Sequence, residues 1–141
     1  GIYDMSGGYW ERTSSYINNK HEHLQHYGDS VTYQEGAMKT TNTKYTTVYL
    51  SNEKEEIDVN KAASKNFAAN TKVYGDAVRE TTNKIAGTTN VGWNISGWNS
   101  DCSCFPALAW PFFQRGGSLW MGSQSGAFSF TRSYLWISML W

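Results

Sequence analysis

The chain has 141 residues, with 12 basic and 12 acidic side chains and a formal net charge of zero. That length allows one domain with a hydrophobic core. The neutral balance excludes a general attraction to nucleic acid or to an anionic membrane. No apolar run reaches the roughly 20 residues that a membrane-spanning helix needs. Because the chain begins at Gly1 rather than Met, we expect a processed protein or a fragment of a longer one.

Composition changes near Gly92. Residues 92–141 contain only three charged side chains, Asp101, Arg115 and Arg132, but six of the seven tryptophans. Each part alone would be too small or too apolar to be stable, so we expect the two parts to pack together in a single domain spanning residues 1–141.

Several elements are predicted in the first half. Residues 1–10 contain a turn at 6–8 followed by a short apolar segment at Tyr9-Trp10. Residues 13–36 are polar and irregular, which predicts a surface loop. Residues 44–50 alternate like a strand. Residues 52–70 are the best helix candidate, capped by Ser51 or Asn52, although the weak apolar stripe allows a start nearer Asp58.

The last thirty residues, 112–141, carry the clearest pattern. Short strands are predicted at 112–114 and 127–130, with a final one at 138–141. One set of residues is expected to be fixed by backbone geometry or packing: Arg115, Gly116, Gly117, Gly122, Gly126, Phe128 and Phe130. Large aromatic and small polar residues lie between them, and this mixture is typical of a recognition surface.

Residues 21–26 read HEHLQH. A zinc-protease motif would place its second histidine four residues after the first, but position 25 is Gln. On a strand, His21 and His23 would share a face and could bind a metal with a distant third ligand. A solvated polar loop is the favoured interpretation.

Cys102 and Cys104 are separated by one residue, and a disulfide across that spacing would be strained. Such a pair can bind a soft metal. Because the neighbouring residues offer no further soft ligands, small and partly buried side chains are favoured.

Arg115 lies in an apolar stretch before two glycines, so we expect it to be partly buried and paired. Asp4 is the proposed partner, and direct contact with a ligand is the alternative.

Two motifs resemble a known family. GIYDMSGGYWE (1–11) resembles the signature Gly-Leu-Tyr-Asp-Met-x-Gly-Asn-x-Trp-Glu of the formylglycine-generating enzyme (sulfatase-modifying factor) domain, and FFQRGGS (112–118) resembles its later Arg-Gly-Gly-Ser signature. The resemblance implies an α+β, C-type-lectin-like domain with short antiparallel strands, one or two helices and long loops.

The enzymes of that family carry catalytic thiols in a C-terminal segment, where this chain has no cysteine. A non-catalytic branch is more similar: the variable proteins of diversity-generating retroelements of bacteria and phages. RGGSLWMGSQSGAFSF (115–130) matches their C-terminal pattern, and GDAVRET (75–81) is similar to bacterial members. In that branch a lectin-like frame presents diversified side chains on one surface.

Carried over by position, the resemblance implies a variable ligand-binding segment at 112–141. Its expected ligand-binding residues are Ser118, Trp120, Met121, Gln124, Ser129, Thr131, Arg132, Ser133, Tyr134 and Trp136. Trp120, Tyr134 and Trp136 would be the main anchors, since such rings bury a large area with few rotatable bonds. Phe128 and Phe130 are expected to point into the core.

The expected function is a non-catalytic receptor or adhesin module, on a bacterial cell surface or phage particle, that binds a protein or glycan. No nucleic acid, membrane insertion or cofactor is expected, and Ca²⁺ is possible but not indicated. One alternative is a divergent formylglycine-generating-type oxidase with copper at Cys102 and Cys104. Another is a structural, pilus-like surface subunit.

Overall fold

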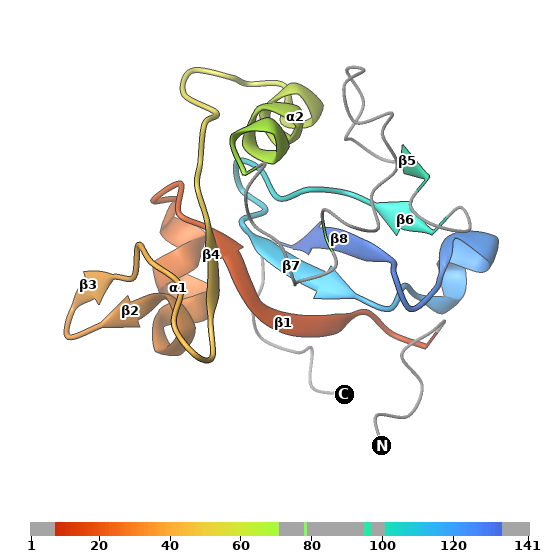
Figure 1. Ribbon diagram of the computed structural model, residues 1–141, viewed down its shortest axis with the longest axis horizontal. Coiled ribbons are helices and arrows are strands. Elements are labelled where there is room, and N and C mark those ends of the chain that lie inside the picture. Colours follow the sequence, from red (N-terminus) through yellow and green to blue (C-terminus); the bar gives the residue numbers. More distant parts are fainter. Residues whose placement is uncertain (1–7, 71–77, 79–94, 97–100, 134–141) are drawn as a thin grey trace.

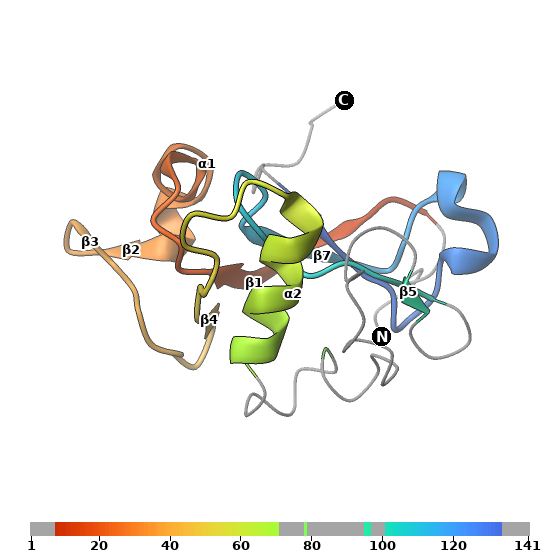
Figure 2. The same cartoon turned by 90° about the horizontal axis from the view of Figure 1, so that it is seen from above.

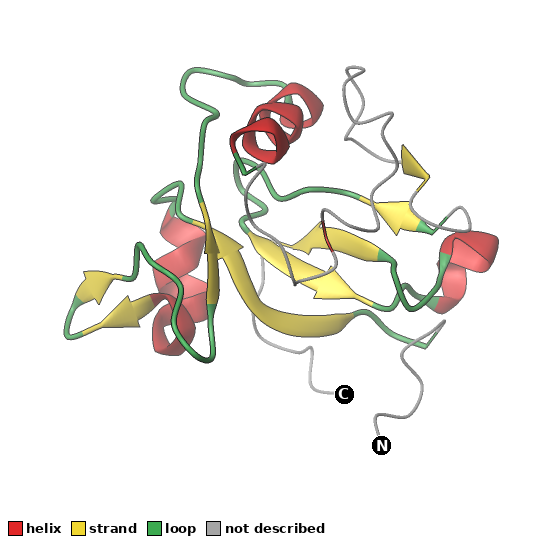
Figure 3. Ribbon diagram, in the orientation of Figure 1, coloured by secondary structure: helices red, strands yellow, loops and turns green. Residues whose placement is uncertain are grey.

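The computed structural model describes residues 8–70, 78, 95–96 and 101–133. Along the chain lie β1 (Glu11–Ile17), α1 (Glu22–Thr32), β2 (Tyr33–Gln34), β3 (Ala37–Met38), β4 (Thr47–Tyr49), α2 (Val59–Ala69), β5 (Ile95–Ser96), β6 (Cys102–Ser103), β7 (Phe112–Arg115), the 3-10 helix η3 (Leu119–Gln124) and β8 (Phe130–Ser133). Loops join these short elements (Figure 3). The chain is therefore mixed α+β, as the sequence predicted.

Six strands form one sheet in the order β4-β1-β7-β8-β6-β5, and β2 and β3 form a separate hairpin. β1 pairs with β4 and β6 pairs with β8 in parallel, so the expectation of antiparallel strands holds for only part of the sheet. α1 and α2 lie on opposite sides of it (Figures 1 and 2).

Neighbouring residues in the three strands β4, β1 and β7 supply two separate cores. Tyr16, Val48 and Phe112 pack with Leu24 and Val31 of α1. The residues that follow them, Ile17, Tyr49 and Phe113, pack with Ala62, Ala63 and Phe67 of α2. Since successive side chains of a strand point to opposite faces, both faces of the sheet are buried at this end.

The prediction of a surface loop at 13–36 is wrong, because this stretch forms β1, α1 and β2. The buried positions of α1 have helical spacing, but two of the four are Gly28 and Thr32 rather than apolar residues. A Cβ on Gly28 would lie 2.5 Å from Cζ of Phe112, so the ring packs directly on the helix backbone. The hydroxyl of Thr32 donates to the carbonyls of Leu24 (2.7 Å) and Gly28 (3.0 Å). The apolar periodicity that identifies a helix is therefore concealed.

The helix predicted within 52–70 is confirmed, with its start at the later of the two positions considered. Asp58, not Ser51 or Asn52, caps α2 by accepting from the backbone N–H groups of Asn60 (2.9 Å) and Lys61 (3.0 Å). The strand predicted at 44–50 is also present, as the shorter β4.

The strands predicted near the C-terminus are β7 and β8. β7 covers the predicted 112–114, but β8 begins at Phe130 instead of ending there. Phe130 is fully buried, as expected, whereas Phe128 is only half-buried. The strand predicted at 138–141 lies outside the described residues. Among the residues described, no helix has the length and apolar character needed to cross a bilayer.

Candidate ligand-binding surface

The segment 116–129, called the tip loop here, joins β7 to β8 and contains η3. It lies at one end of the sheet, away from α1 and the β2–β3 hairpin (Figure 1). A hydrogen bond of 3.1 Å from Gly116 N to the Ser129 carbonyl joins the two ends of the loop, next to β7 and β8. Bonds of 2.9 Å from Ser129 N to Gly126 O and 3.1 Å from Ser125 N to Gly122 O fix its far side. The loop backbone is therefore closed on itself.

A close approach between the two sides of the loop explains Gly117. Its φ is +82°, and a Cβ there would lie 2.6 Å from the Cα and Oγ of Ser125. The Ser125 hydroxyl donates to the carbonyl of Ser118 at 2.6 Å. A larger residue at position 117 would separate these two sides.

A buried carboxylate supports the loop from below. Asp101 is only 5% exposed, and its Oδ2 accepts from the backbone N–H of Phe128 at 3.1 Å. A Cβ on Gly126 would overlap the Asp101 carboxyl group, so only glycine fits against it. Gly116 and Gly122 also have positive φ, so all four glycines predicted to form the frame have a backbone role.

Residues near the N-terminus contact the other side of the tip loop. Leu119 N donates to the Gly8 carbonyl at 2.9 Å, which brings Tyr9 near η3. Three large side chains stay exposed on this end of the molecule: Tyr9 at 73%, Leu119 at 75% and Trp120 at 88%. The tip loop thus combines a fixed backbone with exposed apolar side chains.

The structure separates the predicted ligand-binding residues into two groups. Ser118, Trp120, Met121 and Gln124 share the tip loop, where Trp120 is exposed, Met121 and Gln124 are half-buried, and Ser118 is 7% exposed. Ser129, Thr131, Arg132 and Ser133 belong to β8 or immediately precede it. Tyr134 and Trp136 lie outside the described residues.

Three of the second group are not on the surface. Ser129 is completely buried, and Thr131 and Ser133 are 7% and 8% exposed. The alternation that would expose Ser129 beside a buried Phe128 is therefore wrong, because Ser129 is the more deeply buried of the two. Arg132 is half-buried, and its Nη2 donates to Asn60 Oδ1 of α2 at 3.1 Å.

A second rigid element, the turn at 107–110, lies at the other end of β7. Ala107 and Trp110 exchange two backbone hydrogen bonds of 3.1 and 2.9 Å. Glu53 Oε2 accepts from Leu108 N at 2.9 Å, and Asn19 Nδ2 donates to Leu108 O at 2.8 Å. His23 Nδ1 lies 2.7 Å from the Ala109 carbonyl. Trp110 stays 38% exposed on this turn.

Glu53 is the centre of the polar contacts below the turn. It is 7% exposed, and its two oxygens also accept from Asn19 Nδ2 (2.6 Å) and Asn66 Nδ2 (2.7 Å). The sequence interpretation missed Trp110 as an exposed residue. Its position before Pro111, which disfavours helical backbone, was the available signal.

Cys102 and Cys104 are buried thiols that are not joined by a disulfide, and their sulfur atoms lie 3.8 Å apart. The hydrogen bond to Cys104, followed by burial, raises the pKa of Cys102. The thiolate is therefore disfavoured, and buried thiols of this kind are poorly reactive. Both side chains are more completely buried than the partial burial that the sequence predicted.

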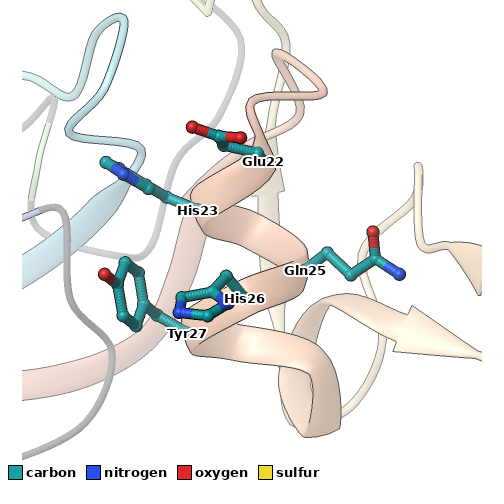
Figure 4. Close-up of a pocket in the computed structure, with 5 residues that line it drawn as sticks. All are labelled: Glu22, His23, Gln25, His26 and Tyr27. Atoms are coloured by element: carbon teal, nitrogen blue, oxygen red, sulfur yellow. The ribbon is translucent and has the colours of Figure 1, made fainter.

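The histidine-rich stretch is the start of α1, not a loop. His21 caps this helix, with Nδ1 accepting from His23 N at 3.2 Å. Glu22, His23, Gln25, His26 and Tyr27 line a surface depression, but all come from this one helix, and Gln25 points away from the others (Figure 4). Within the described ranges, no three His, Cys, Asp or Glu side chains form a group that could hold a metal ion.

Arg115 is half-buried, and its guanidinium lies 5.8 Å from the centre of the Phe130 ring. The proposed partner Asp4 lies outside the described residues. No family model, curated protein or solved structure matches the chain.

Proposed function

We propose that this protein is a non-catalytic ligand-binding module that uses the tip loop as its recognition surface. One observation carries the proposal: Leu119 and Trp120 are 75% and 88% exposed on a loop whose backbone is fixed on both sides. A tryptophan exposed to this extent stabilises the fold very little. Clustered exposed aromatic and aliphatic side chains mark interaction sites on soluble domains.

The fixed backbone favours binding. A loop that is already ordered loses little conformational entropy on association, so more of the contact energy contributes to affinity. Trp120 supplies a large, rigid surface with an N–H group for one hydrogen bond. Gln124, the half-buried last residue of η3, is a polar side chain of the kind that adapts to different ligands.

We further propose a C-type-lectin-like domain related to the variable proteins of diversity-generating retroelements, acting on a bacterial surface or phage particle. The arrangement of glycines supports this, because positions 116, 117, 122 and 126 of the matching motif have backbone roles while Trp120 between them is exposed. The ligand would be a protein or glycan. A near-copy repeat of the DNA encoding residues 112–141, differing at adenines and adjacent to a reverse-transcriptase gene, is the expected genomic sign; its absence would remove the diversification proposal.

Binding is tested by comparing Trp120→Ala with Tyr45→Ala, which removes another aromatic side chain that is 76% exposed. We expect the wild type and Tyr45→Ala to bind the same member of an array of immobilised bacterial surface proteins and glycans, and Trp120→Ala to lose that signal. Both variants should unfold within about 0.5 kcal/mol of the wild type. Undiminished binding by Trp120→Ala would contradict the proposal.

The copper oxidase and the structural subunit are alternatives based on sequence alone. The first requires stoichiometric Cu(I) binding that is lost in Cys102→Ser, and a titration of the reduced protein tests it.

A further inference from the structure

Three polar or aromatic side chains from different elements meet beside the 107–110 turn. The Arg132 guanidinium of β8 lies 5.7 Å from the centre of the Trp110 ring. Its Nη2 donates to Asn60 Oδ1 at 3.1 Å, and its Nη1 to the Val59 carbonyl at 3.4 Å. Trp110, Arg132 and Asn60, called the turn cluster here, lie at the end of β7 opposite to the tip loop.

The turn that presents Trp110 is held in an unusual conformation. Leu108 has a φ of +49°, which non-glycine residues rarely adopt. Its N–H donates to the buried Glu53, and its carbonyl accepts from the half-buried Asn19. Backbone strain of this kind is found where a site must hold one geometry. Trp110 remains 38% exposed despite Arg132 over its ring.

The turn cluster has hydrogen-bonding capacity left for a ligand. Arg132 carries five N–H donors, and within the described part of the chain only two hydrogen bonds from them are made. Because Asn60 Oδ1 accepts from Arg132, the Nδ2 group of that amide is left as a donor. The Trp110 indole N–H has no acceptor among the described residues either. The three groups therefore retain donors for a bound molecule.

Charges of both signs lie around the turn cluster. Asp58 immediately precedes Val59, and its exposed carboxylate interacts electrostatically with both Lys61 and Arg132. This carboxylate would repel an anionic ligand, and it offers an acceptor beside the donors. These donors and the Asp58 acceptor together suit a neutral ligand that carries both hydrogen-bond donors and hydrogen-bond acceptors.

We propose that the turn cluster is a binding subsite for a neutral sugar residue of a glycan. The ring C–H groups of a sugar form an apolar face that packs on an indole, whose face is electron-rich. Its hydroxyls can accept from Arg132 and Asn60 and donate to Asp58. This subsite is separate from the tip loop and does not depend on its function.

The test uses the ¹⁵N-labelled protein and the indole resonances of its tryptophans, with Trp110→Ala to assign the signal of Trp110. The probes are five neutral oligosaccharides (malto-, cello-, laminari-, xylo- and mannohexaose) and one acidic sugar, trigalacturonate. We expect at least one neutral probe to shift the Trp110 signal saturably. Asn60→Ala, which keeps the Asp58 cap, should weaken that binding about 5- to 10-fold, the loss of one hydrogen bond.

Each other result would overturn the subsite. No shift of Trp110 with any neutral probe, or equal affinity in Asn60→Ala, would leave the turn cluster without a ligand-binding role. A stronger response to trigalacturonate would show that the turn cluster prefers an anionic sugar to a neutral one. Trp120→Ala should leave the Trp110 response unchanged, so this test and that of the tip loop can fail separately.

Discussion

The two ends of β7 hold their exposed tryptophans in different ways. At the C-terminal end, backbone contacts of the tip loop fix its shape: Gly117 against Ser125, and Gly126 against Asp101. At the N-terminal end, side chains distant in sequence fix the 107–110 turn, chiefly Glu53 and Asn19. The shape of the tip loop depends on small residues at the contact positions. The shape of the 107–110 turn depends on hydrogen bonds to polar side chains beneath it. Substitutions should therefore affect the two ends by different mechanisms.

The largest effect is expected from Glu53→Ala. It leaves the donors of Asn19, Asn66 and Leu108 without their acceptor, and each buried donor without a partner costs about 1–3 kcal/mol, partly offset by entering water. We expect a loss of about 3 kcal/mol in the free energy of unfolding, measured by urea denaturation.

Glu55→Ala is the matched control, since Glu55 is exposed. It should change stability by no more than about 0.5 kcal/mol. A loss below about 1 kcal/mol in Glu53→Ala would show that buried polar pairing does not hold the turn.

An intermediate effect is expected from Gly126→Ala. The new methyl group displaces the Asp101 carboxylate, and the hydrogen bond from Phe128 N is lost. We expect a loss of about 2 kcal/mol in stability, together with weaker binding at the tip loop.

Gly36→Ala provides the comparison for Gly126→Ala. A Cβ at Gly36 meets no atom within 4 Å, but φ is +77°, so only the backbone conformation is penalised, by about 1 kcal/mol. Binding should not change. Equal losses of stability, with binding intact in both variants, would rule out a specific role for the Gly126–Asp101 contact.

The smallest effect concerns pH and the helix that supports the turn. Burial, followed by the nearby His23, lowers the pKa of His21 in the folded protein, against weaker opposing effects of Glu22 and Glu53. As pH falls, His21 therefore takes up its proton at a higher pH in the unfolded chain than in the folded protein. The free energy of unfolding decreases as pH drops below about 6.5 and stops decreasing below the folded-state pKa. Protonation of Nδ1 also removes the acceptor that caps α1.

His21→Asn keeps a capping oxygen that does not titrate. We expect this variant to show a shallower decline of Tm between pH 7 and pH 5 than the wild type, as followed by circular dichroism. Identical declines would place the pH dependence elsewhere in the molecule.

The sequence predicted the tip loop better than the turn, and the reason is physical. Glycines that allow a close approach or positive φ are visible as a local pattern, so Gly116, Gly117, Gly122 and Gly126 could be recognised as frame. The contacts of Glu53 join residues 34 and 55 positions apart, and no local pattern reveals them. α1 was missed because Gly28 and Thr32 take positions where apolar residues would have marked a helix.

The burial of Ser129, Thr131 and Ser133 could not be predicted for a related reason. Small polar residues are typical of surfaces, but Thr131 and Ser133 lie in β8, which has neighbours on both sides in the sheet, and Ser129 immediately precedes it. Among the described residues, Ser129 Oγ has no hydrogen-bond partner although it is buried. Residue type alone gave the wrong environment here, whereas for Trp120 the position between frame glycines gave the right one.

The pairing of β1 with β7 limits which insertions the fold can accept. Between Arg12 and Tyr16 the strand advances four residues while its partner advances only two, from Gln114 to Phe112. The two extra residues are an even number, so Tyr16 still faces α1 and Ile17 still faces α2. A single inserted or deleted residue in β1 would exchange these faces and disrupt both cores. Among natural or designed variants, we therefore expect length changes in this strand to occur in pairs.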